Sequence, residues 1–454
     1  MNVGRPASRW KHGVRITTAT VVGFVITLCL WRLVLDRLVV AQFAAIHEKS
    51  CPVSLAELNR WYPRVPPEEN VAVLLGKAFA NLSGRSDPFP SQRNDLETGS
   101  PAKDSPAILQ DQAVEDYLHR NNDALALLHQ ASHLLRSRYP IDLGTLSIRP
   151  YSHLANLLYS AHLLEMEGID AIHCNDPQSA VVSVQSLFAL SHSLEKEPLV
   201  RSYLARLECQ RIAIGSLQNL LSGAGLTDAQ LGSLADSMDK AEDPRGMARA
   251  FIGQRCIGIY GFDLLGNTMD PTLLPVARSR PLGQRILVNL DAFLSSPEYL
   301  YGLCGFLRWD ELHYLQFMDR YIQTAQMVFP ERIDAARDLA RALEQQGRLH
   351  AFSRGWLRGM NGPRLILKDA SITASLRAAR IAVAIERFRL AHGDLPHSLV
   401  ELDPFGLQAL PSDPFDGQPL RYRKLARGYA LYGVGDDEAG STDRKKDVAF
   451  VVER

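Results

Sequence analysis

The spacing of apolar residues is the most regular feature of the chain. From Gln110 onward they recur every three or four positions, as they do along one face of an amphipathic helix. The clearest stripes are Leu154, Leu157, Leu158, Ala161 and Leu164; Val181, Val184, Leu187, Phe188 and Leu194; and Leu204, Leu207, Ile214, Leu217 and Leu221. Breaks between helices are predicted at Gly168, Glu197-Pro198 and Gly223 to Gly225.

Shorter signals extend this helical pattern in both directions. Thr227 and Gln230 have capping-box spacing, which predicts the start of a fourth helix. Further helices are predicted from Ser54, over 70–82, 245–265, 282–294, 298–329 and 331–346, with loops over 83–106 and 266–281. Antiparallel helices joined by short turns predict an irregular, solenoid-like helical body over 50–369, although no strict repeat period is present.

The segment near the N-terminus is apolar in a different way, because it has no polar face. No charged residue interrupts the run from Ile16 to Trp31, and a single transmembrane helix is predicted over 14–35. Basic residues without acidic ones precede it, so the positive-inside rule predicts a cytoplasmic tail over 1–13, an inner-membrane span and a periplasmic remainder. The alternative is a cleaved signal peptide, with its cleavage site around Ala41 to Ala45.

The last part of the chain changes from helix to strand. A final amphipathic helix is predicted over 377–388, ending at Gly393, and turn-forming residues fill 411–419. Three short β-branched or aromatic runs follow, at 420–423, 429–434 and 448–452. Residues 370–454 are therefore predicted to form a small α+β module with a three-stranded antiparallel sheet. The chain as a whole is predicted to be mainly α.

Three motifs of this module resemble a known family. His392 to Leu399, Leu410 to Pro419 and Tyr429 to Asp436 follow one another as in the globular end of the major pseudopilins of type II secretion systems. The resemblance implies a calcium ion in the loop after the last motif, and by motif position its ligands are Asp436, Asp437, Asp443 and Asp447. Oxygen ligands suit this cation. A solvated acidic loop without calcium is the alternative.

Two further comparisons define how far this resemblance extends. Pseudopilins are cut after a Gly and carry a Glu at the fifth mature position, but counting from Gly13 that position holds Thr18. Assembly into a pilus by that route is therefore not expected. The whole arrangement also resembles a set of uncharacterised bacterial membrane proteins, in which a helical body precedes the same C-terminal module. That likeness implies no activity.

Composition narrows the classes of partner. Fifty acidic and fifty basic side chains balance, whereas a nucleic-acid-binding protein needs a basic excess. The six cysteines include no C-x-x-C pair. Those at Cys209, Cys256 and Cys304 lie in apolar helical runs and are expected to be buried thiols, although an oxidising compartment would allow one bridge.

The sequence contains few candidate residues for a metal site, a catalytic site or a binding surface. His129 and His133 have the spacing at which two imidazoles on one helix face share a metal, but the Glu of H-E-x-x-H is missing. Asp310 and His313 lie one turn apart, as a carboxylate and a base would. The basic and aromatic stretch from Arg348 to Lys368 fits a membrane surface, a partner helix, or a solvated helix with a core-facing Trp.

These observations favour a membrane-anchored periplasmic scaffold or interaction protein, in envelope assembly or secretion, without a catalytic activity or a required cofactor. Protein partners in the cell envelope are expected. One alternative is a periplasmic enzyme, which requires His129, His133, Asp310, Glu311 or His313 to converge in one pocket. The other is a receptor that binds a peptide or glycan in an apolar groove between helices.

Overall fold

The computed structural model describes residues 7–83, 111–144, 151–269, 301–302, 304–345, 350–405, 410–435 and 449–454. The chain divides into two compact units. The smaller comprises 1–55, 255–320 and 342–360, and the larger comprises 56–254, 321–341 and 361–454.

The helices are α1 (Ala7–Glu48), α2 (Leu55–Trp61), η1 (Pro67–Glu69), α3 (Val71–Asn81), α5 (Asp111–Arg120), α6 (Asn122–Ala131), α7 (Ser152–His173), α8 (Pro177–His192), α9 (Val200–Gly223), α10 (Asp228–Asp239), α11 (Gly246–Met269), α15 (Phe306–Gln326), α16 (Glu331–Glu344), α17 (Ala351–Met360), α18 (Gly362–His392) and η4 (Leu399–Phe405).

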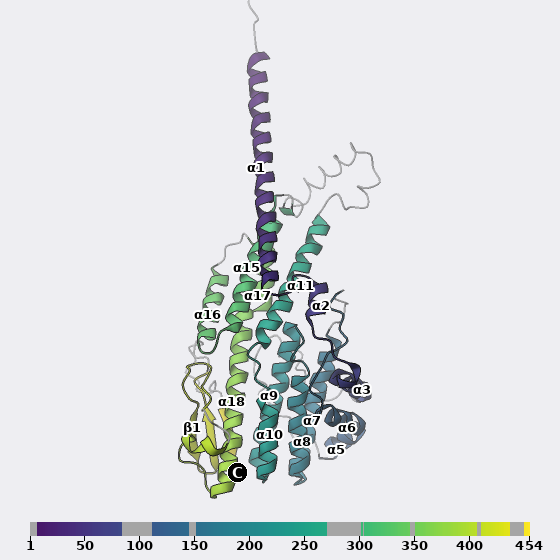
Figure 1. Cartoon of the computed structure of the whole chain (residues 1–454), viewed down its shortest axis with the longest axis vertical. Coiled ribbons are helices and arrows are strands. Elements are labelled where there is room, and N and C mark those ends of the chain that lie inside the picture. Colours follow the sequence, from purple (N-terminus) through teal and green to yellow (C-terminus); the bar gives the residue numbers. More distant parts are fainter. Residues whose placement is uncertain are drawn as a thin grey trace, which may run out of the picture. The chain divides into compact units, whose positions relative to one another are not determined.

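Helices α7, α8 and α9 pack against one another in the larger unit, and α10 lies against α8 (Figure 1). Thr227 and Gln230 form the predicted capping box at the start of α10. The helix break predicted at Gly168 is wrong, because α7 continues through it to His173. A Cβ at Gly168 would lie 3.6 Å from that of Ser183, an ordinary van der Waals contact, so α8 lies directly beside this glycine. The helical class is confirmed, while the solenoid-like arrangement stays a prediction.

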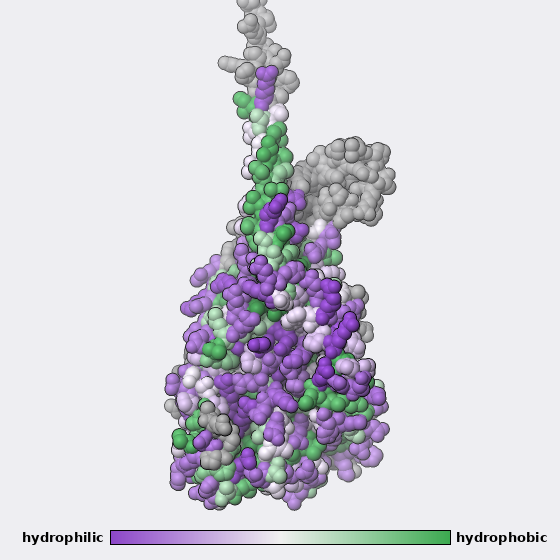
Figure 2. Space-filling view, in the orientation of Figure 1, coloured by the Kyte–Doolittle hydropathy of each residue, from purple (hydrophilic) through white to green (hydrophobic). Residues whose placement is uncertain are grey.

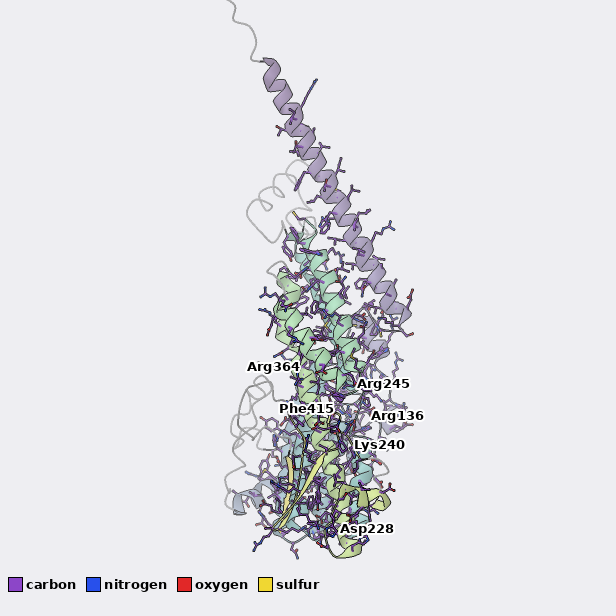
Figure 3. The ribbon with its side chains drawn as sticks, turned by 90° about the vertical axis from the view of Figure 1, so that its left-hand side faces the viewer. Arg136, Asp228, Lys240, Arg245, Arg364 and Phe415 are labelled. Carbon is purple, nitrogen blue, oxygen red and sulfur yellow. The ribbon has the colours of Figure 1, made fainter. Side chains whose placement is uncertain are left out.

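Helix α18 is the central element of the larger unit. It contains the predicted helix over 377–388, where the predicted apolar stripe is buried and Arg377, Arg380 and Arg387 remain partly exposed. One side packs on α9 and α10, and another contacts the sheet. Ion pairs from Arg387 to Asp228 and from Arg380 to Asp239 join it to α10, whose ends are marked by Asp228 and Lys240 in Figure 3. The predicted module boundary at residue 370 falls inside this helix.

The three predicted strands are confirmed as β1 (Arg421–Leu425), β2 (Gly428–Tyr432) and β3 (Ala449–Glu453). They form an antiparallel sheet in the order β1-β2-β3. Gly428 begins β2 with a φ of 126°, and a Cβ there would meet the Val452 carbonyl oxygen. Only glycine fits this position without strain. The four predicted calcium ligands lie outside the described residues, so calcium stays a prediction.

Helix α1 belongs to the smaller unit. Its segment Arg15–Glu48 is long and apolar enough to cross a membrane, and its apolar surface is visible in Figure 2. The helix continues beyond the predicted membrane span of 14–35, to Glu48. The extension packs Leu35, Val39 and Ile46 into an apolar cluster that is completed by Ile259, Leu312 and Leu315. The predicted burial of cysteine thiols is confirmed for Cys209 and Cys256 but is wrong for Cys304, which is only partly buried.

Candidate functional site

The two histidines proposed to share a metal do not lie on one helix face. Helix α6 ends at Ala131, so His133 follows the helix rather than completing its next turn. His129 instead contacts α7 and α8. Its Nδ1 lies 2.9 Å from Ser186 Oγ, and its Nε2 lies 3.0 Å from Glu167 Oε1. The i, i+4 spacing therefore does not place both rings on one helix face, because the helix ends two residues before His133.

Ser186, His129 and Glu167 lie in the order of a nucleophile, a base and an orienting acid. If Glu167 accepts the Nε2 proton, Nδ1 accepts the hydroxyl proton of Ser186. However, Ser186 lies inside α8 and only 2 % of its surface is exposed. Its amide is an interior helix amide, so it cannot serve as an oxyanion donor as well. The arrangement binds three helices together and offers a substrate no access to the hydroxyl.

Asp310 is the centre of a second polar cluster, in the smaller unit. This carboxylate on α15 is fully buried. It accepts hydrogen bonds from the backbone amides of Phe352 at 2.8 Å and Ser353 at 3.2 Å, from the Ser353 hydroxyl, and from Tyr301 Oη at 3.0 Å. The two amides belong to the first turn of α17. Asp310 therefore caps α17 from a neighbouring helix, where a negative charge is favoured by the helix dipole.

His313 is oriented by the same serine. Its Nδ1 lies 2.8 Å from Ser353 Oγ. Because that hydroxyl donates its proton to Asp310, it accepts from His313, and Nδ1 carries the hydrogen. Burial and, to a smaller extent, the nearby His350 lower the pKa of His313 to about 4, against the opposing effect of Asp310. His313 is therefore neutral near pH 7 and presents the lone pair of Nε2.

His350 completes the cluster from the residue just before α17. Its ring stacks on that of His313, with centroids 3.9 Å apart and planes at 10°. It also contacts Trp309, at 4.3 Å between centroids. Its Nδ1 lies 3.6 Å from Asp310 Oδ1, too far for a hydrogen bond. Burial lowers the pKa of His350, against the effect of Asp310, so both stacked rings favour the neutral form.

Asp310, His313 and His350 each place a metal-compatible atom within 4.8 Å of the others. Two features oppose coordination in this geometry. The carboxylate already accepts four hydrogen bonds, which occupy its lone pairs. The imidazole lone pairs lie in two nearly parallel ring planes, so a cation shared by both would sit out of each plane. A metal would require the rings to rotate, and the present arrangement suits two neutral histidines.

The sequence identified only part of this cluster. It paired Asp310 with His313 but missed His350 and Ser353, which come from another helix. The signal that could have found them is the basic and aromatic stretch from Arg348 to Lys368, which begins beside His350. Within it, Trp356 packs edge-on against Phe262 at 4.8 Å, which supports the interpretation as a helix with a core-facing Trp. The stretch is not one helix, because Asn361 adopts a φ of 50° between α17 and α18.

The sequence candidates are divided between the two units: His129 lies in the larger unit, whereas Asp310, Glu311 and His313 lie in the smaller one. No protein-family model, curated protein or solved structure matches this chain. The resemblance of its C-terminal part to pseudopilins therefore rests on the three sequence motifs alone.

Proposed function

We propose that this protein is a single-pass membrane protein that holds partner proteins of the bacterial cell envelope, with its N-terminus in the cytoplasm and its helical units and sheet in the periplasm. Helix α1 is the observation that carries the proposal. Its residues 15–34 are almost entirely exposed, and at about 1.5 Å per residue they span about 30 Å, the thickness of a hydrocarbon core.

The packing of α1 favours a permanent anchor over a cleaved signal peptide. Cleavage around Ala41 to Ala45 would remove Leu35 and Val39, both 2 % exposed, from the core of the smaller unit. Burying a large aliphatic side chain contributes about 1.5–3 kcal/mol. The same helix thus serves both as anchor and as part of the fold, which ties the smaller unit to the membrane surface.

Both polar clusters make structural contacts among the described residues. Ser186, His129 and Glu167 satisfy one another inside the larger unit, and Asp310 uses its carboxylate to cap α17. An enzyme would use the Nε2 lone pair of His313 as a base, but we find no nucleophile or substrate-binding groups positioned around it among the described residues. A scaffold needs no such groups.

Thiol labelling in intact cells tests the orientation. Cys174 is exposed in the larger unit, whereas Cys209 is buried. A small membrane-impermeant maleimide should label the full-length protein in intact cells, and the Cys174→Ser variant should lose most of that label. Labelling of Cys174 only after lysis would refute the periplasmic location.

Retention in the membrane and partner capture test the rest of the proposal. The full-length chain should stay in the membrane fraction after an alkaline carbonate wash. Purification from solubilised membranes should recover specific envelope proteins, compared with an unrelated single-pass protein expressed at the same level. If no envelope protein exceeds that control, the scaffold function is wrong even if the anchor is correct.

A further inference from the structure

The smaller unit carries an aromatic cluster at the level where the exposed part of α1 ends. We define the interfacial cluster as Trp31, Tyr301, Phe306 and Trp309. The rings form a continuous chain: Trp31 and Trp309 have centroids 6.4 Å apart, Trp309 and Phe306 6.1 Å, and Phe306 and Tyr301 5.5 Å. Trp31 is 40 % exposed and Phe306 39 %. These are large apolar surfaces for residues that also belong to a packed unit.

The cluster is fixed to α1 by close packing at the start of α15. Gly305 has a φ of 80°, and a Cβ there would lie 3.0 Å from Arg32 Cγ and 3.4 Å from Leu35 Cδ1. The start of α15 is therefore held beside residues 31–35 of α1. Those are the residues at which α1 changes from an exposed helix to a buried one.

A second helix brings exposed apolar surface to the same place. A Cβ at Gly266 of α11 would lie 3.8 Å from Leu307 Cδ2, next to Phe306. Leu264, two residues away on α11, is 53 % exposed. Apolar side chains from α1, α11 and α15 thus share one level of the smaller unit.

Charged groups begin directly beyond the aromatic rings. Arg308 pairs with Asp36 of α1 at 3.4 Å and with Glu311 at 2.6 Å, and its side chain remains about half exposed. Arg32 and Arg37 flank Asp36 in sequence. The order along α1 is therefore a charge-free apolar segment, then aromatic rings, then arginines. This is the order found across a membrane boundary, where Trp and Tyr lie at the headgroups and arginines reach the phosphates.

We propose that the interfacial cluster, with Leu264, is a membrane-contact surface that inserts into the headgroup region of the bilayer spanned by α1. The inference rests on the proposed anchor, and the occupant is the lipid of that same membrane. Continuity with the exposed segment of α1 selects lipid over a second protein, because the bilayer that covers residues 15–34 ends at the level of these rings. The smaller unit is then seated on the membrane rather than held away from it on a tether.

Depth-dependent fluorescence quenching of the full-length protein in lipid vesicles tests this surface. Doxyl groups near the acyl carbonyls quench tryptophans at the headgroup level, and iodide quenches those in water. The Trp309→Phe variant should lose a distinct part of the lipid-quenched emission and leave the part from Trp31, and from Trp10, which precedes the span in sequence. The Trp61→Phe variant is the matched control, since Trp61 belongs to the larger unit, and it should lose none.

A variant that adds lipid-quenched tryptophan emission distinguishes a missing contact surface from a misfolded protein. Phe306→Trp should add a lipid-quenched component of about the size contributed by Trp309. If the emission of Trp309 and the emission added by Phe306→Trp are quenched by iodide, or are shielded from both quenchers by another protein, the membrane-contact surface is wrong. Trp31→Phe separates this failure from failure of the anchor. A lipid-quenched Trp31 with an unquenched Trp309 refutes only the contact surface, whereas absence of lipid quenching at both refutes the anchor.

Discussion

Acidification should weaken the smaller unit through His313. Burial lowers the pKa of this residue from 6.5 to about 4, so between these values the unfolded chain binds more protons than the folded one. Stability is therefore greatest above about pH 6.5 and falls as the pH drops towards 4, where the loss is complete. His350 acts in the same direction, because its pKa is also lowered.

The magnitude follows from the shift. A change from 6.5 to about 4 corresponds to about 3.4 kcal/mol, at about 1.36 kcal/mol per pKa unit. His313 is partly exposed to solvent, which screens its interactions, and we expect about 1 to 2 kcal/mol after that discount. A difference of this size changes an opening equilibrium by a factor of about 5 to 30.

Hydrogen exchange in peptides of α15 and α17 measures this effect locally, after correction for the intrinsic pH dependence of exchange. Protection should fall between about pH 8 and pH 5 in the full-length protein, and the fall should be smaller in the His313→Gln variant, which cannot be protonated. His173→Gln removes an exposed histidine from the larger unit and should leave the fall unchanged. An equal fall in wild type and His313→Gln would refute the reasoning.

Three substitutions test other parts of the fold. Asp310→Ala removes the cap of α17 and should cost about 2 kcal/mol, seen as faster exchange in the first turn of α17. Asp369→Ala leaves the buried Arg332, 3.0 Å away in the wild type, without its carboxylate, and should cost about 3–5 kcal/mol in denaturant unfolding of the larger unit. Asp338→Ala, which breaks an exposed ion pair, is its control and should cost less than about 1 kcal/mol. Gly428→Ala should cost about 1–3 kcal/mol, because alanine is strained at a φ of 126°; unchanged thermal unfolding would contradict this.

Local signals predicted local structure well. The capping box at Thr227, the helix end at Gly393 and the three strands depend on residues close together in sequence, and the structure confirms them. The helix break predicted at Gly168 was wrong because glycine lowers helix propensity without preventing a helix. The packing of α7 against α8 and α9, which favours a continuous helix, depends on residues distant in sequence.

The polar clusters were harder to predict because their members are distant in sequence. Asp310 looked like half of a catalytic pair with His313, yet its carboxylate is committed to two backbone amides of α17, and no sequence pattern marks a cap that comes from another helix. The same reasoning applies to α1. Its composition predicted the exposed part, residues 15–34. Leu35, Val39 and Ile46 are as apolar as the exposed residues, so composition alone does not show that they are buried. Only their contacts with Ile259, Leu312 and Leu315 show that α1 continues into the fold, and that continuity carries both the proposed anchor and the proposed membrane-contact surface.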